Sequence, residues 1–132
     1  MATNIQRVEH IYAAFGAGDI PSILDALHPA IEWEHDASDH GMPWLKLRRG
    51  RAEVGKFFET LAAFEFHRFE PLNMTAGGNQ VISVIAVDIT LKTSGHKIRD
   101  LELHLWTFDD QGQVTRFRHM VDTHQHWLAW KG

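Results

Sequence analysis

Hydrophobic side chains recur at helical intervals in the first half of the chain. The spacing predicts an amphipathic helix over residues 3–16. A shorter helix is predicted to begin at the N-cap residue Asp19 and to end at His28, with Leu27 in its apolar stripe. The same periodicity predicts a third helix over residues 51–64.

Two non-helical segments separate the second and third predicted helices. Residues 31–35 alternate as in a short strand. Residues 36–49 are predicted to form a polar loop that contains only a few apolar side chains. These are Met42, Trp44, Leu45 and Leu47.

From residue 66 onward the hydrophobic period changes from helical to alternating. Strands are predicted over residues 66–74, 80–92, 97–108 and 114–124, and short turns join them. Successive strands joined by short turns form an antiparallel meander. Helices followed by a meander predict an α+β fold, in which three N-terminal helices cover one face of a curved sheet.

The predicted strand over residues 97–108 has two different faces, because side chains alternate along a strand. One face is Leu101, Leu103 and Leu105, and the other is Asp100, Glu102, His104, Trp106 and Phe108. Aromatic side chains mixed with a few polar groups are typical of a ligand pocket. If the last two strands align through their turn, His104 and His119 lie on the same face.

Apolar side chains are therefore expected on both faces of the sheet. The predicted helices can cover only one of these faces. We expect a second copy of the chain to cover the other, which predicts a homodimer formed through a sheet face.

Length and composition narrow the class of protein. The 132 residues suit a single domain that spans residues 1–132. The net charge of −4 argues against a nucleic-acid partner, and no apolar run predicts a membrane span or a signal peptide. The chain has no cysteine, which is compatible with the cytoplasmic location that we expect. It has no phosphate-binding or dinucleotide-binding motif, so no cofactor is expected.

Several segments, taken in order, resemble one known superfamily. A tyrosine-bearing first helix ends in Gly-Ala-Gly-Asp at residues 16–19, and Ala-Leu-His-Pro-Ala-Ile-Glu-Trp follows at residues 26–33. Gly50 then precedes a helix ending in Phe-Phe, and Asp-Gln-Gly-Gln-Val at residues 110–114 leads to Asp122. This order resembles the nuclear-transport-factor-2-like superfamily, nearest its SnoaL-like and ketosteroid-isomerase-related branch.

The resemblance implies a cone-shaped α+β fold, also described as a cystatin-like roll. It also implies a deep apolar pocket between helices and sheet, and usually a dimer. Enzymes with this fold include isomerases, polyketide cyclases, epoxide hydrolases and dehydratases. Other members have no known activity, because a fold does not determine a function.

An ungapped alignment with the family predicts where catalytic groups would lie. The base of ketosteroid isomerases falls at His35, and their two oxyanion donors fall at Ile11 and His104. The final aspartate of the epoxide hydrolases falls at His119. Since all four differ from the family residues, neither chemistry is expected unchanged. The cyclase branch is more similar, because it can place a histidine on the penultimate strand.

The candidate catalytic residues are therefore His104, His119 and His35, because imidazole can move a proton near neutral pH. Tyr12 could donate a hydrogen bond to an oxyanion or simply pack in the core. The predicted substrate-binding residues, on the wall of one cavity that contains His104, are Tyr12, Phe15, Trp33, Phe58, Glu102, Trp106 and Phe117. A structural alternative remains for the histidine pair, in which Glu102 or a backbone carbonyl simply satisfies both rings.

A metal site is not expected. The residues His119, Asp122, His124 and His126 are ligand types close together in the sequence, but their spacing matches no helix-based zinc motif.

Two functional hypotheses follow from these residues. The first is an enzyme that uses acid–base histidines, without a cofactor, to isomerise, cyclise, dehydrate or hydrolyse a small apolar substrate. The second is a non-catalytic module that uses the same fold for small-molecule binding or dimerisation. An enzyme requires the histidines to converge on one enclosed volume, whereas a binding protein requires only the volume.

Overall fold

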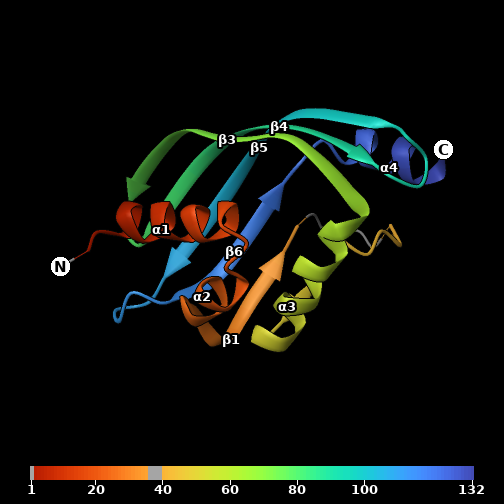
Figure 1. Ribbon diagram of the computed structural model, residues 1–132. Helices are drawn as coiled ribbons and strands as arrows, with labels where there is room; N and C mark the ends of the chain where they lie inside the picture. The colour runs from red at the N-terminus through yellow and green to blue at the C-terminus, as the bar shows by residue number, and fades with distance from the viewer. Residues whose placement is uncertain (1, 36–39) are drawn as a thin grey trace.

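Six strands form one curved sheet, and three helices lie along one of its faces (Figure 1). The structure is a computed structural model that describes residues 2–35 and 40–132. The strands, in their order across the sheet, are β2 (Arg48–Arg49), β1 (Leu27–Glu34), β6 (Val114–Met120), β5 (Lys97–Phe108), β4 (Gln80–Leu91) and β3 (Phe64–Gly77). Strands β3 to β6 form the predicted antiparallel meander, and β1 pairs in parallel with β6. The sheet is therefore mixed, and the predicted α+β fold is confirmed.

The helices that cover the sheet are α1 (Asn4–Gly16), α2 (Ile20–Asp25) and α3 (Arg51–Thr60), and the short 3₁₀ turn η1 (Leu61–Ala63) follows α3. Helix α1 begins where Thr3 and Gln6 form a capping box, which satisfies two backbone N–H groups at the helix start. Its Val8 and Ile11 are buried against the sheet. No described helix is both long enough and apolar enough to span a membrane.

The boundary between α2 and β1 differs from the prediction. Helix α2 ends at Asp25, so the assignment of Leu27 to a helical stripe was wrong, and Leu27 is the first residue of β1. The ladder between β1 and β6 is irregular between Leu27 and Glu32. Pro29 lies in this irregular part. Proline has no backbone N–H, and here the regular ladder does not require one.

The end of the chain also differs from the prediction. Strand β6 stops at Met120 rather than near residue 124, and a helix, α4 (Thr123–Lys131), follows it. The side chain of Asp122 accepts a hydrogen bond from the backbone N–H of Gln125 and so caps the start of α4. Figure 1 shows α4 at the end of the sheet opposite the N-terminus.

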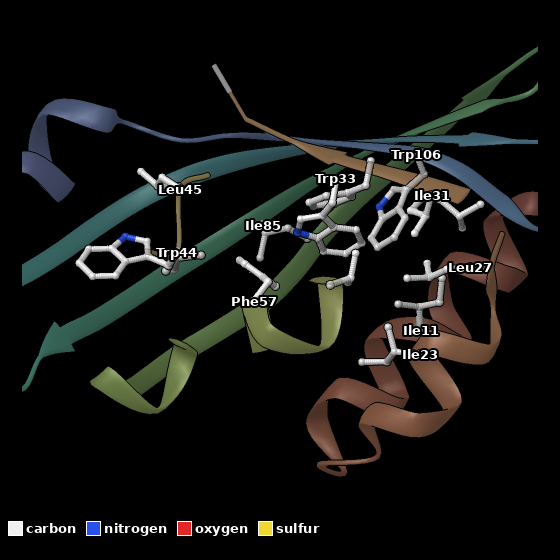
Figure 2. Close-up of a cluster of buried hydrophobic side chains, with 14 of the residues drawn as sticks. Ile11, Ile23, Leu27, Ile31, Trp33, Trp44, Leu45, Phe57, Ile85 and Trp106 are labelled. Atoms are coloured by element: carbon white, nitrogen blue, oxygen red, sulfur yellow. The ribbon is translucent and has the colours of Figure 1, made fainter. Parts of the chain in front are cut away.

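The predicted polar loop contributes to the core. Its first residues, 36–39, lie outside the described residues. Met42, Trp44 and Leu45 are buried, whereas Leu47 is exposed. In Figure 2, Trp44 and Leu45 lie at one end of the buried cluster, and Ile11 and Ile23 of the first two helices lie at the other end.

Candidate functional site

Strand β5 presents its polar side chains to the interior. Glu102, His104 and Trp106 are buried beneath the helices, whereas Leu101 and Leu103 are 63% and 38% exposed on the opposite face. The alternation predicted from the sequence is confirmed. The face that carries the acidic and histidine side chains is the inner one.

Strand β6 brings a second histidine to this inner face. His119 is the register partner of His104, as expected from an alignment through the turn, and the centroids of the two rings are 5.1 Å apart. Both histidines contact the same carboxylate oxygen, Oε1 of Glu102. The Nε2 atom of His119 lies 2.8 Å from this oxygen, and Nε2 of His104 lies 3.3 Å from it.

Helix α1 extends this hydrogen-bonded cluster on the other side of His104. The hydroxyl oxygen of Tyr12 lies 2.7 Å from Nδ1 of His104. The indole Nε1 of Trp106 donates a hydrogen bond of 3.1 Å to the same hydroxyl oxygen. The result is a continuous chain from His119 through Glu102, His104 and Tyr12 to Trp106, which we call the polar chain.

Burial and hydrogen bonding shift the pKa values within the polar chain. Burial alone would raise the pKa of Glu102, but His119 and His104 beside it hold that pKa well below its usual range. Burial lowers the pKa of His104, although its hydrogen bond to Glu102 acts in the opposite direction. Burial also raises the pKa of Tyr12. At neutral pH, Glu102 is therefore ionised, His104 is neutral and Tyr12 keeps its hydrogen.

These charge states determine where each hydrogen lies. An ionised carboxylate only accepts hydrogen bonds, so the Nε2 atoms of His104 and His119 both donate to Glu102. Because His104 is neutral, its Nδ1 accepts the hydrogen of Tyr12. The hydroxyl of Tyr12 thus donates to a protein group, which differs from the oxyanion donor considered from the sequence.

His119 is left with one nitrogen outside the polar chain. Its Nε2 contacts Glu102, which leaves Nδ1 outside the polar chain. When the ring is neutral, this nitrogen carries the lone pair, because the hydrogen is on Nε2. The side chain is 14% exposed and lines a cavity. It can therefore accept a proton from a molecule in that cavity.

The cavity lies between the helices and the inner face of the sheet. Its empty volume is about 690 Å³, including the part open to solvent. The lining is mostly aromatic and aliphatic, and the polar chain forms one of its walls. Besides His104 and His119, it contains every predicted substrate-binding residue, namely Tyr12, Phe15, Trp33, Phe58, Glu102, Trp106 and Phe117. Trp33 stacks on Phe117 at 4.0 Å, and Figure 2 shows Trp33 and Trp106 close together in the buried cluster.

The third catalytic candidate is His35. It is buried just after β1, but it is not among the residues that line the cavity. The structure therefore brings together His104 and His119 but not His35.

Two cavity residues whose side chains can form hydrogen bonds were missed from the sequence. Trp44 comes from the segment predicted as a polar loop, and His126 comes from α4, whose first residues were predicted to be the end of a strand. The indole Nε1 of Trp44 donates a hydrogen bond of 2.9 Å to Nδ1 of His126. The spacing of Asp122 and Gln125, which caps α4, is the sequence signal that could have indicated this helix.

Only one group of at least three metal-ligand side chains gathers among the described residues. Glu102, His104 and His119 each offer one ligand atom, and these atoms lie within 4.8 Å of one another. Two imidazoles and one carboxylate could bind a divalent transition metal. The sequence set around His124 does not gather, because Asp122 caps α4 and His124 is exposed.

A curved sheet with helices on one face and an apolar cavity between them defines an α+β cone of the nuclear-transport-factor-2-like class. Residues 8–117 match the SnoaL-like domain family, and the chain belongs to this family.

Solved structures confirm the fold over the whole chain. An NTF2-like protein of unknown function from Burkholderia pseudomallei has a TM-score of 0.87 and 24% identity over all of both chains. An NTF2-like protein from Burkholderia thailandensis has a TM-score of 0.86 and 27% identity, again over all of both chains. TerC, co-crystallised with polyporic acid, has a TM-score of 0.82 and 24% identity over 98% of each chain. Comparison with curated proteins gives no match.

Proposed function

We propose that the protein is an acid–base enzyme that acts, without a cofactor, on a small and mostly apolar molecule bound in the cavity. The observation that carries the proposal is the contact of two histidines with one buried carboxylate, at the wall of an otherwise apolar cavity. In this proposal His119 is the general base and Glu102 is its partner.

The geometry gives each residue of the polar chain a role. Nδ1 of His119 removes a proton from the bound molecule, and the ring becomes an imidazolium. Glu102, 2.8 Å away, stabilises this positive charge and holds the ring in the required tautomer. His104 and Tyr12 act as positioning residues, because their hydrogen bonds fix the carboxylate from the other side.

Proton transfer of this kind supports isomerisation, cyclisation or dehydration. His119 takes a proton from one atom of the substrate and returns it to another atom or to a leaving hydroxyl. The proton balance closes within the site, so no external oxidant or reductant is required. The apolar lining favours such a step because it excludes water from the base.

A test of this proposal uses 5-nitrobenzisoxazole, a small aromatic probe for a base in an apolar cavity. The base removes the ring C–H proton, the N–O bond breaks, and a coloured cyanophenolate forms. We expect saturable turnover, and we expect His119→Gln to lower the rate about 10²- to 10⁴-fold. His124→Gln, which changes an exposed histidine on α4, is the matched control and should leave the rate unchanged.

Two results would contradict the proposal. If the probe binds but reacts no faster than with free imidazole, the cavity is that of a non-catalytic binding module. If turnover is lost on treatment with a chelator and restored by a divalent metal, Glu102, His104 and His119 act as metal ligands instead. We expect turnover to be unaffected by the chelator.

We also propose that the chain forms a homodimer through the outer face of the sheet. Ile82, Leu101 and Leu103 are exposed there, and Val84 and Met120 are register partners of Leu103 on the neighbouring strands. A contiguous apolar surface of this kind is typical of an interaction site.

A further inference from the structure

His126 is a polar residue of the cavity wall that does not belong to the polar chain. It lies on α4, is only 2% exposed and lines the same cavity as His119. Around it are the aromatic rings of Trp44 and Phe64. Trp44 is itself packed edge-on against Phe64 and Trp130, with ring centroids 4.8 Å and 5.3 Å away.

The hydrogen bond from Trp44 defines the tautomer of His126. An indole nitrogen can only donate, so Nδ1 of His126 must accept, and the ring hydrogen lies on Nε2. Burial lowers the pKa of His126 to about 4, so the ring is neutral at pH 7. His126 therefore presents an N–H donor without a positive charge.

That donor has no partner among residues 2–35 and 40–132. Nε2 of His126 is buried, and no side chain or backbone group of the described chain accepts from it. Nε1 of Trp33, another cavity-lining side chain, is also a buried donor without an acceptor. Buried donors are nearly always satisfied in native proteins, so unsatisfied donors in a cavity wall indicate a ligand that supplies acceptors.

We propose that the pair His126–Trp44 forms a subsite for an acceptor oxygen of the ligand, and that Nε2–H of His126 donates to a carbonyl oxygen. This inference rests on the proposed function and names its substrate class, an apolar or aromatic carbonyl compound. The subsite selects against hydrocarbons, because they leave the donor unsatisfied. It also selects against cationic ligands, because it offers no acceptor and the rest of the lining is largely apolar.

The position of the subsite relative to the base agrees with one ligand reaching both. His126 and His119 both line this one cavity. A carbonyl compound whose oxygen contacts His126 can thus place its apolar body against the aromatic lining and approach His119.

The test compares the binding of two probes that differ only at the acceptor. These probes are 2-acetylnaphthalene and 2-isopropenylnaphthalene, in which a C=CH₂ group replaces C=O at nearly the same shape. For the wild-type protein, we expect the ketone to bind about 2- to 10-fold more tightly, as one hydrogen bond allows. We also expect the Nε2–H proton resonance of His126 to shift when the ketone is added but not when the alkene is added.

His126→Phe should bind both probes equally and retain its affinity for the alkene, whereas the control His124→Phe should keep the preference. If His126→Phe does not fold, the resonance of His126 in the wild-type protein still decides the question. The inference is overturned if the wild-type protein shows no preference and no shift, or if the preference persists in His126→Phe. His119→Gln should keep the preference, so failure of the catalytic proposal can be distinguished from failure of this one.

Discussion

The two faces of β5 differ in a way that reverses the usual pattern of burial. On the inner face, Glu102 and His104 are buried, and on the outer face Leu101 and Leu103 are exposed. Ionisable side chains are rarely buried unless they are paired, because burial removes their hydration. The inner face satisfies this condition through the polar chain. The inner face is therefore organised around the buried charge of Glu102. The outer face exposes leucines that need an apolar partner surface.

The largest effect is expected from removing the buried charge on the inner face. Glu102→Gln keeps the shape but removes the carboxylate that holds both histidines. We expect turnover of 5-nitrobenzisoxazole to fall about 10²- to 10⁴-fold, because the imidazolium of His119 loses its partner.

The control for this variant is the same glutamate-to-glutamine substitution at the protein surface. Glu65→Gln, at an exposed position on β3, should keep the wild-type rate. A Glu102→Gln protein that is folded and fully active would show that the inner carboxylate has only a structural role.

Because His104 and His126 are buried, we expect the free energy of unfolding to decrease as the pH falls from 7 to 5. Burial brings the pKa of His126 to about 4 and lowers that of His104, against about 6.5 in an unfolded chain. Below pH 6.5 the unfolded chain binds more protons, so the stabilisation is complete above pH 6.5 and is lost as the pH falls toward 4. For His126 the loss is on the order of 3 kcal/mol by pH 4.

Urea unfolding at pH 7, 6 and 5 measures this dependence. His126→Phe should show a flatter dependence than the wild-type protein, whereas His124→Phe should not. An unfolding free energy that stays constant over this range would be incompatible with His104 and His126 being buried and neutral.

The outer face should respond differently, with an effect on association and little effect on the fold. Leu103→Glu places a charge in the exposed apolar surface, and we expect it to convert a dimer into a monomer in light scattering. Its unfolding free energy, extrapolated to the monomer, should change by no more than about 0.5 kcal/mol. Gln111→Glu, in the exposed β5–β6 turn, adds the same charge elsewhere and should remain dimeric. A monomeric wild-type protein would disprove the dimer.

Most of the fold could be predicted from local signals in the sequence. The helical spacing of the first segment, the alternation along β5 and the short turns of the meander are local features, and the structure confirms each of them. The parallel pairing of β1 with β6 joins segments far apart in the chain, and no local pattern specifies it. The second helix was predicted to extend to His28 because the irregular ladder that accommodates Pro29 depends on this pairing.

The candidate site was predictable where it follows strand alternation. Glu102, His104 and His119 share a face because of their spacing and register, so the sequence indicated their proximity. Trp44 and His126 were missed because their contact joins a loop to a C-terminal helix 82 positions apart. His35 was assigned to the cavity by alignment, and side-chain placement at a strand end does not follow from alignment alone.

The central claim is that Glu102 holds His119 with its Nδ1 free to accept a proton. The most direct measurement is the tautomer of each histidine, from the ¹⁵N chemical shifts of the imidazole nitrogens at neutral to slightly alkaline pH. The account predicts that His119, His104 and His126 all carry their hydrogen on Nε2, and that the Nε2–H signal of His119 is displaced in Glu102→Gln. A neutral His119 with its hydrogen on Nδ1 would contradict the account, because that nitrogen could not then act as the base.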